Sequence, residues 1–347
     1  MKISTRTLLA AALLVALPTS GAMACTITNW NGTNTAAAAN TGGPAQSIAR
    51  YSGVCALSVD TGKYVVDNTP GTEGTYRARF YVLTKAVGGT VTVFKASASD
   101  NGGGAAVIEV DYTGSAFNFR SNGTTVGSGV SGIQANKWYS VEVFYKSGGN
   151  FTASVWGAGG NAEIGNVSGS AGTGTVGSAV LGVSSGTAST ALGFDAFEST
   201  RSETTAIGRL CRGDANGDGN LNIFDRSTVL NETLGTAYAS GQPDCNEDGA
   251  INIKLPKGVD ARQVDLKSCM ADLPKTHTGQ CNVAKGHIVG VAYNDTNVPF
   301  AAGIVPIGKL YIQSRGKGNR VGSLRVSEFL VSDKNANAIE SVAKIAE

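Results

Sequence analysis

Histidine is almost absent from this chain of 347 residues, which contains only two. Both His277 and His287 follow residue 205, so a Ser/His/Asp catalytic arrangement is excluded from the first 205 residues. The two histidines also lack the spacing of zinc ligands, and the sequence has no Cys-x-x-Cys pair. A zinc site built from cysteine and histidine is therefore not expected.

An excess of charge of one sign is also lacking. The chain has 28 Lys and Arg residues against 26 Asp and Glu residues, a formal net charge of +2, and no basic cluster. This balance argues against nucleic acid or an anionic membrane as a partner. Long apolar runs are missing after the N-terminal residues, so no membrane span is expected.

Residues 1–24 have the pattern of a secretory signal peptide. A basic head precedes an apolar centre at residues 8–17, and the small-residue cleavage site AMA follows at residues 22–24. The apolar centre is too short to span a bilayer. Cleavage would make Cys25 the first mature residue, which raises a lipoprotein anchor as an alternative. We favour simple export, because Ala22 stands where lipoprotein signals usually carry leucine, and expect a secreted, extracellular protein.

Proline is sparse, at 8 residues, whereas glycine is plentiful, at 47. Such a composition suits an exported β-sandwich with many turns. Apolar and polar side chains alternate along residues 76–83 and 138–145, as they do in half-buried strands, and residues 121–124 (SNGT) indicate a hairpin turn. We therefore predict a mainly β protein in which residues 25–205 form a two-sheet, jelly-roll-like sandwich.

The six cysteines form an even set suited to disulfides. Cys25 and Cys55 are a plausible pair that would hold the N-terminus of the mature chain. The connectivity of the other four stays open: Cys211, Cys245, Cys269 and Cys281.

The stretch DANGDGNLNIFD, residues 214–225, has oxygen-bearing groups at the spacing of a calcium loop. Calcium takes six to eight oxygen ligands, and the sharp turn at position six needs glycine, here Gly219. The alternative is an ordinary polar surface turn, since Asp, Asn and Gly dominate turns. We predict calcium, with these ligands: Asp214, Asn216, Asp218, Asn220 through its carbonyl, Asn222 and Asp225.

A second loop begins in the same way, with Asp244, Asn246, Asp248, Gly249 and Asn252. Its twelfth position is Leu255, whose side chain offers no oxygen. If residues 254–258 are an insertion, Asp260 takes the twelfth position. The alternative is a loop that has lost calcium.

Each loop precedes a predicted helix. Val229, Leu230, Thr233 and Leu234 fall on one face of the first helix, and Gly235 is a suitable stop. The second helix carries an apolar stripe from Leu266 to Leu273. Both stripes are most simply the core of a small module.

These repeats, GDANGDGNLNIFDRSTVLNETLG and DCNEDGAIN followed by VDARQVDLKSC, resemble the dockerin module of cellulosomes. The resemblance implies a dockerin at residues 206–281, calcium as its cofactor and a cohesin-domain protein as its partner. Partner contacts would come from Ile223, Phe224, Leu230 and Asn231. The resemblance implies these ligands for the second loop: Asp244, Asn246, Asp248, Ala250 through its carbonyl, Asn252 and Asp260.

The segments YRARFYV, WYSVEVFY and LGFDAFESTRS resemble the concanavalin A/laminin-G-like sandwich. The remaining residues, 282–347, are predicted to be β-rich. Their segments GIVPIGKLYI and LRVSEFLVSDKNANAI are similar to the second half of a cohesin, whose first half is missing.

Glu109 and Asp111 lie on one face of a predicted strand, an arrangement similar to the Glu-x-Asp motif of sandwich-type retaining glycosidases. The second carboxylate of that motif is absent, because Thr113 and Gly114 occupy its place, so the pair is incomplete. We expect solvent-facing strand residues there, and turn or surface groups at Asp195 and Glu198.

Binding is the better hypothesis for the sandwich, with Trp138, Tyr139 and Trp156 as stacking faces for a polysaccharide. The alternatives are that these aromatic residues belong to the core, and that the sandwich has a structural or adhesive role without a glycan. The sequence thus predicts a secreted, non-catalytic modular protein. The alternative is a dockerin-borne glycoside hydrolase acting in polysaccharide breakdown.

Overall fold

The computed structural model describes residues 25–27, 30, 39–157, 159–160, 162–221 and 223–251, and the backbone of residues 331–332 and 338–339. The chain divides into two compact units, Met1–His287 and Ile288–Glu347. In the second unit, β14 (Val331–Ser332) pairs in antiparallel fashion with β15 (Ala338–Ile339). The predicted signal peptide, the second predicted helix and the rest of the predicted β-rich tail lie outside the described residues.

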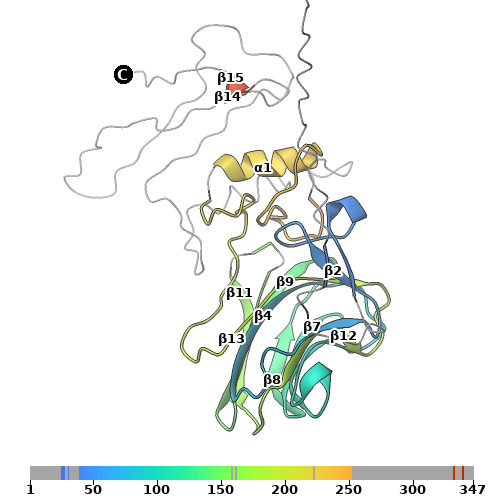
Figure 1. Ribbon diagram of the computed structural model, residues 1–347, viewed down its shortest axis with the longest axis vertical. Helices are drawn as coiled ribbons and strands as arrows, with labels where there is room; N and C mark the ends of the chain where they lie inside the picture. The colour runs from blue at the N-terminus through green and yellow to red at the C-terminus, as the bar shows by residue number, and fades with distance from the viewer. Residues whose placement is uncertain are drawn as a thin grey trace, which may run out of the picture. The chain divides into compact units, whose positions relative to one another are not determined.

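In the first unit, two antiparallel sheets form the sandwich expected from the alternating pattern (Figure 1). The first sheet contains, in spatial order, β1 (Asn40–Gly42), β2 (Ala56–Val59), β13 (Leu192–Thr200), β4 (Thr75–Leu83), β9 (Trp138–Lys146), β10 (Asn150–Gly157) and β11 (Glu163–Ser170). The second contains β3 (Tyr64–Asp67), β12 (Ser178–Ser185), β5 (Val91–Ser97), β6 (Ala106–Tyr112), β7 (Ala116–Ser121) and β8 (Thr124–Ser131). The predicted mainly β fold class is confirmed.

The core of the sandwich lies between the sheets, because alternate residues of each strand point inward. On β4, Tyr76, Ala78, Phe80 and Val82 are buried in this core. Phe80 stacks on Phe94 from the other sheet, with ring centroids 5.3 Å apart. Burial of these large side chains is the main stabilising contribution to the fold.

The predicted hairpin turn is confirmed between β7 and β8. Ser121 pairs with Thr124, and the two residues between them, Asn122 and Gly123, have φ values of 49° and 77°. Two consecutive positive φ angles define the turn type that suits the right-handed twist of a hairpin.

The opposite face of the first sheet is also covered. A second apolar cluster, consisting of Tyr51, Tyr81, Leu83 and Trp138, packs on that face. The chain after β13 crosses it: the Gly208 N–H donates to Glu142, and the Leu210 N–H donates to the Tyr81 hydroxyl, each over 2.8 Å. Both faces of β9 are therefore buried, from Trp138 to Tyr145.

Helix α1 (Ile223–Thr233) confirms the first predicted helix, and Gly235, with a φ of 72°, follows its end as expected. Val229 is buried with Ala215 and Ala239 in a small third cluster. Leu234, which was predicted on the buried face, is instead 56% exposed, because the helix ends before it. No helix in the described ranges is long and apolar enough to cross a membrane.

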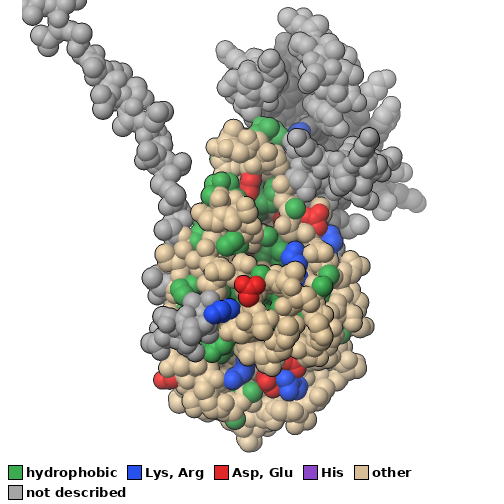
Figure 2. Space-filling model, turned by 90° about the vertical axis from the view of Figure 1, so that its right-hand side faces the viewer, with side chains coloured by type: hydrophobic (Ala, Val, Ile, Leu, Met, Phe, Trp, Pro, Cys, Tyr) green, Lys and Arg blue, Asp and Glu red, His purple; other side chains and the backbone are tan. Residues whose placement is uncertain are grey.

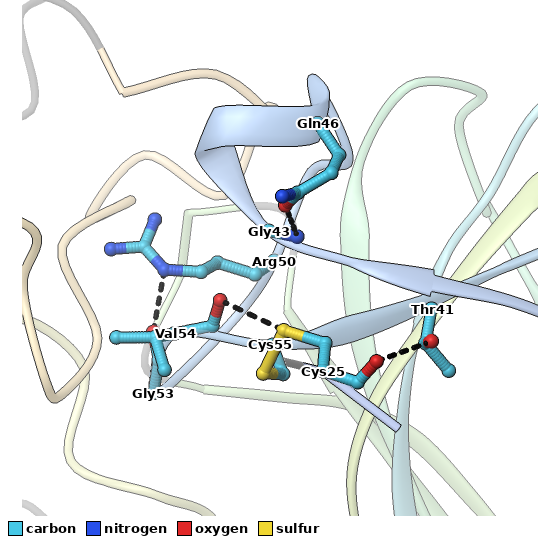
Figure 3. Close-up of a disulfide and its surroundings, with 8 residues drawn as sticks. All are labelled: Cys25, Thr41, Gly43, Gln46, Arg50, Gly53, Val54 and Cys55. Carbon is cyan, nitrogen blue, oxygen red and sulfur yellow. Dashed lines mark hydrogen bonds between the residues drawn. A yellow bond between two sulfur atoms is a disulfide. The ribbon is translucent and has the colours of Figure 1, made fainter. Parts of the chain in front are cut away.

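The remaining short elements of the first unit are the 3-10 helices η2 (Pro44–Gln46) and η3 (Asp100–Gly102). The expected disulfide between Cys25 and Cys55 is present, close to the segment that carries Arg50 (Figure 3). Cys211 and Cys245 each take part in a disulfide as well. On the described part of the face shown in Figure 2, positively and negatively charged side chains are interspersed, without a large patch of one sign.

Candidate metal-binding loops

The first predicted calcium loop turns tightly around the carboxylate of Asp214. This carboxylate accepts hydrogen bonds from three successive N–H groups, those of Gly217 (2.8 Å), Asp218 (3.1 Å) and Gly219 (2.8 Å). Gly219 makes the turn with a φ of 79°, a conformation that glycine adopts without steric strain. Asp214 itself is only 8% exposed.

Further side-chain oxygens of this loop follow the same turn. Asn216 Oδ1 accepts from the Asp218 N–H over 3.0 Å, and Asp218 Oδ1 accepts from the Asn220 N–H over 2.7 Å. Asp225, in the first turn of α1, accepts from the Asn216 N–H over 3.3 Å. The structure thus brings Asp214, Asn216, Asp218 and Asp225 to one turn, while Asn222 lies outside the described residues.

The second loop repeats four of these bonds at equivalent positions. Asp244 accepts from the N–H groups of Asp248 (3.1 Å) and Gly249 (2.7 Å), as Asp214 does from Asp218 and Gly219. Asn246 Oδ1 accepts from the Asp248 N–H over 2.9 Å, and Asp248 Oδ1 accepts from the Ala250 N–H over 2.9 Å. Two segments thirty residues apart therefore share one conformation. The other two predicted ligands, Asn252 and Asp260, lie outside the described residues.

The chemistry of these donors suits a hard cation, which prefers carboxylate, amide and carbonyl oxygens. Burial, and after it the charge of Asp218, raises the pKa of Asp214. A cation bound beside this carboxylate would favour its ionised form, because the opposite charges attract. Within the described ranges, no three His, Cys, Asp or Glu side chains form a group that could hold a metal ion. The three aspartates predicted as ligands of the first loop, Asp214, Asp218 and Asp225, therefore do not form such a group, and calcium in this loop stays a prediction.

A residue that the sequence pattern did not single out joins the second loop to the sandwich. Glu247 is fully buried, and its side chain accepts hydrogen bonds from the Tyr51 hydroxyl, the Gly159 N–H and Arg209. Its carbonyl accepts from the Trp138 N–H over 2.8 Å. The signal in the sequence that could have identified Glu247 is its position: it stands at position four of the second loop, where the first loop has glycine, Gly217.

A second junction connects α1 with the N-terminal segment. Arg50 forms a two-pronged ion pair with Glu232 of α1, with nitrogen-to-oxygen distances of 2.7 and 2.5 Å, and both side chains are almost fully buried. Arg50 also donates to the Gly53 carbonyl, as Figure 3 shows. These contacts place the residues on the two sides of the predicted 205/206 boundary against one another; the boundary itself stays a prediction.

Two of the three aromatic residues expected to stack on sugars are buried. Trp138 and Tyr139 have no exposed surface, Trp138 in the cluster outside the first sheet and Tyr139 in the main core. That expectation was therefore wrong for both. Trp156, on β10, is partly exposed.

The carboxylates considered for catalysis share an arginine. Glu109 and Asp111 lie on one face of β6, as the two-residue spacing predicts, and Arg120 of β7 lies 3.3 Å from the first and 2.8 Å from the second. The expected solvent-facing position is wrong for Asp111, which is only 6% exposed because the Thr92 hydroxyl and Arg120 pack against its carboxylate. Asp195 was expected at the surface, but its carboxylate accepts hydrogen bonds from the N–H groups of Tyr51 and Ser52. These bonds hold the segment that contains Tyr51 and Ser52 against β13.

Three large apolar side chains are exposed on and just after α1. Phe224, Leu234 and Tyr238 are 49%, 56% and 51% exposed. Phe224 is one of the residues that the dockerin resemblance assigned to partner contacts.

No protein-family model and no curated protein matches this chain. Among solved structures, it is similar to the family 7 alginate lyase A1-II′, with 14% identity, a TM-score of 0.32 and coverage of 43% of this chain and 79% of that one. It is also similar to the cellulose-induced protein Cip1, with 11% identity, a TM-score of 0.34 and coverage of 46% and 84%. A third similar structure is the receptor-binding domain of botulinum neurotoxin type G, with 12% identity, a TM-score of 0.34 and coverage of 50% of this chain and 45% of that one. At these scores the likenesses carry no argument about function.

Proposed function

We propose that this chain is a secreted, non-catalytic modular protein whose two loops bind calcium and form a dockerin-type docking module. The observation that carries the proposal is the equivalence of the loops. Asp214 and Asp244, at position one of each loop, accept the N–H groups of positions five and six, and side-chain oxygens at positions three and five follow the same turn. Ordinary surface turns have no reason to repeat the same hydrogen bonds at the same positions. A pair of calcium loops does, because each must place its oxygen ligands at fixed positions around the ion.

The partner that we propose is a cohesin domain, and the surface that meets it is the outer side of α1. Phe224 on α1 and Leu234 just after its end offer exposed apolar area, and large apolar side chains contribute much of the affinity at protein interfaces. The sandwich would be the cargo, and we propose a polysaccharide as its ligand, with Trp156 as the remaining aromatic candidate. The disulfides fit an oxidising, extracellular location.

Calorimetric titration of the full chain with calcium tests the metal sites. We expect two bound ions in the native protein and one in each of the variants Asp214→Ala and Asp244→Ala. Asp60→Ala, which removes an exposed carboxylate from a turn of the sandwich, is the matched control and should retain both ions. Unchanged stoichiometry in both loop variants would refute the assignment of the loops.

Binding to a panel of immobilised cohesin domains tests the docking. We expect calcium-dependent binding that Phe224→Ala weakens at least tenfold, since a central interface aromatic contributes about 1.4 kcal/mol or more. Ile164→Ala removes an exposed apolar side chain from β11 and should bind normally. Calcium-bound protein that binds no cohesin would refute docking while leaving the calcium sites intact.

A further inference from the structure

Position four of each loop has a left-handed backbone conformation. The φ angle is 74° at Gly217 in the first loop and 56° at Glu247 in the second. Glycine reaches this region freely, whereas a residue with a Cβ atom is strained there. The second loop therefore adopts the conformation of the first with an unfavourable residue at this position, and contacts outside the loop must hold it.

Those contacts come from the sandwich and from Arg209, which follows the last strand of the sandwich. Glu247 Oε1 accepts from the Tyr51 hydroxyl over 2.8 Å and from Arg209, and Oε2 accepts from the Gly159 N–H over 2.8 Å. On the backbone of the loop, the Trp138 N–H donates to the Glu247 carbonyl over 2.8 Å. The side chain and the carbonyl of one loop residue are thus both bonded to strands or to segments adjoining them.

Tyr51 is itself held rigidly. Its ring stacks on Tyr81 at a centroid distance of 3.7 Å and meets the edge of Trp138 at 5.7 Å. Its backbone N–H donates to Asp195 of β13 over 2.6 Å. Burial, and after it the charge of Glu247, raises the pKa of Tyr51 well above the ordinary value, so the phenol remains a donor.

The neighbours of Glu247 in the loop are the predicted ligands. Asn246 and Asp248 flank it, and its own N–H donates to the Asp244 carbonyl over 3.1 Å. Fixing residue 247 therefore fixes the turn that gathers Asp244, Asn246 and Asp248. A site held in its binding conformation binds more tightly than one that reaches it only part of the time.

We propose that Glu247 is a positioning residue, through which the sandwich holds the second loop ready for calcium and so sets the affinity of that loop. The inference rests on the proposed calcium function. Coupling between two equilibria is reciprocal, so calcium in the second loop stabilises the sandwich in turn. Chelation should then lower the thermal stability of the sandwich, instead of leaving it unchanged as separate modules would.

The test uses the full chain carrying Asp214→Ala, so that one calcium ion reports on the second loop. Tyr51→Phe removes only the hydroxyl that binds Glu247 and should weaken calcium binding by about threefold to tenfold. Glu247→Gly gives the second loop the residue that the first loop has at this position, and should also weaken binding. The matched control is Tyr81→Phe, which also removes a hydroxyl from the cluster that contains Tyr51. The Tyr81 hydroxyl accepts from the Leu210 N–H and makes no hydrogen bond to Glu247.

The second readout is thermal unfolding followed by tryptophan fluorescence. All three tryptophans, Trp30, Trp138 and Trp156, precede the calcium loops. Trp30 and Trp156 report on the sandwich, whereas Trp138, whose backbone N–H donates to Glu247, reports on the sandwich and on its contact with the loop. Calcium should raise the midpoint of this transition, and by less in Tyr51→Phe than in Tyr81→Phe.

If the Asp214→Ala protein binds one ion but neither variant at positions 51 and 247 changes the affinity or the calcium-dependent midpoint, the inference is wrong and the proposed function stands. If Glu247→Gly binds calcium more tightly, relief of backbone strain outweighs positioning, and the inference is again wrong. If the native protein binds no calcium, both fail.

Discussion

The Tyr51 hydroxyl donates a 2.8 Å hydrogen bond to Glu247, which lies 196 positions later in the sequence. Both groups are fully buried. An unpaired carboxylate at that depth would be strongly unfavourable, so the bond joins the loop to the sandwich wherever both are folded. The calcium-loop segment and the sandwich are thereby connected through buried polar groups, in addition to the covalent chain between them.

The ion pair between Arg50 and Glu232 should contribute strongly to stability. Arg50→Ala would leave Glu232 buried without its cation, and removal of one partner from a buried pair costs about 3 to 5 kcal/mol. Urea unfolding followed by tryptophan fluorescence measures the loss. Lys146→Ala is the control, because Lys146 and Glu203 form an exposed pair and its removal should change little. Equal effects of the two substitutions would show that Arg50 is not a structural junction.

Asp195 should make stability depend on pH. Desolvation raises its pKa from 3.8 to about 6, although the N–H groups of Ser52, Tyr51 and Ala196 and the charge of Arg50 favour the carboxylate. The folded state therefore binds the proton more tightly than the unfolded state. The stabilisation is complete below about pH 4 and is lost as the pH rises through about 6.

Asp195→Asn provides the comparison, because the amide does not titrate. Relative to this variant, the native protein should lose about 2 kcal/mol of unfolding free energy between about pH 4 and about pH 7. Urea unfolding of both proteins at several pH values measures the difference. A native protein that instead gains stability relative to Asp195→Asn as the pH rises would mean that the backbone N–H groups outweigh desolvation at this carboxylate.

The sequence predicted the elements whose signals are local. Alternation along residues 76–83 identified β4, and the pair Asn122 and Gly123 identified the β7–β8 hairpin, because both depend on neighbouring residues alone. The spacing of Asp214, Asn216 and Asp218 predicts a calcium loop; the structure has a turn around these side-chain oxygens, and calcium itself stays a prediction. The end of the first helix at Gly235 is local in the same way.

Features that depend on distant segments were missed. Trp138 lies on the outer face of β9, which is ordinarily exposed, but Tyr51, Leu210 and Glu247 cover that face. Glu247 looked like any polar turn residue, because its partners Tyr51 and Arg209 come from other parts of the chain. Asp195 was assigned to the surface for the same reason. No periodicity in the sequence reports which face of a sheet a later segment will cover.

We expect no glycoside hydrolysis by the sandwich. Retaining enzymes need one carboxylic acid and one carboxylate placed on either side of the bond, whereas Glu109 and Asp111 share the cation of Arg120. Incubation with a panel of polysaccharides should release no reducing sugar above the blank. Release by the native protein that Glu109→Gln abolishes would establish a hydrolase instead.

The most direct test of the central claim is a count of the calcium ions bound by the full chain, by native mass spectrometry after equilibration with calcium. The equivalence of the loops around Asp214 and Asp244 predicts two ions, one of which is lost in each of the variants Asp214→Ala and Asp244→Ala. A native protein that retains only one ion, or none, would contradict the account.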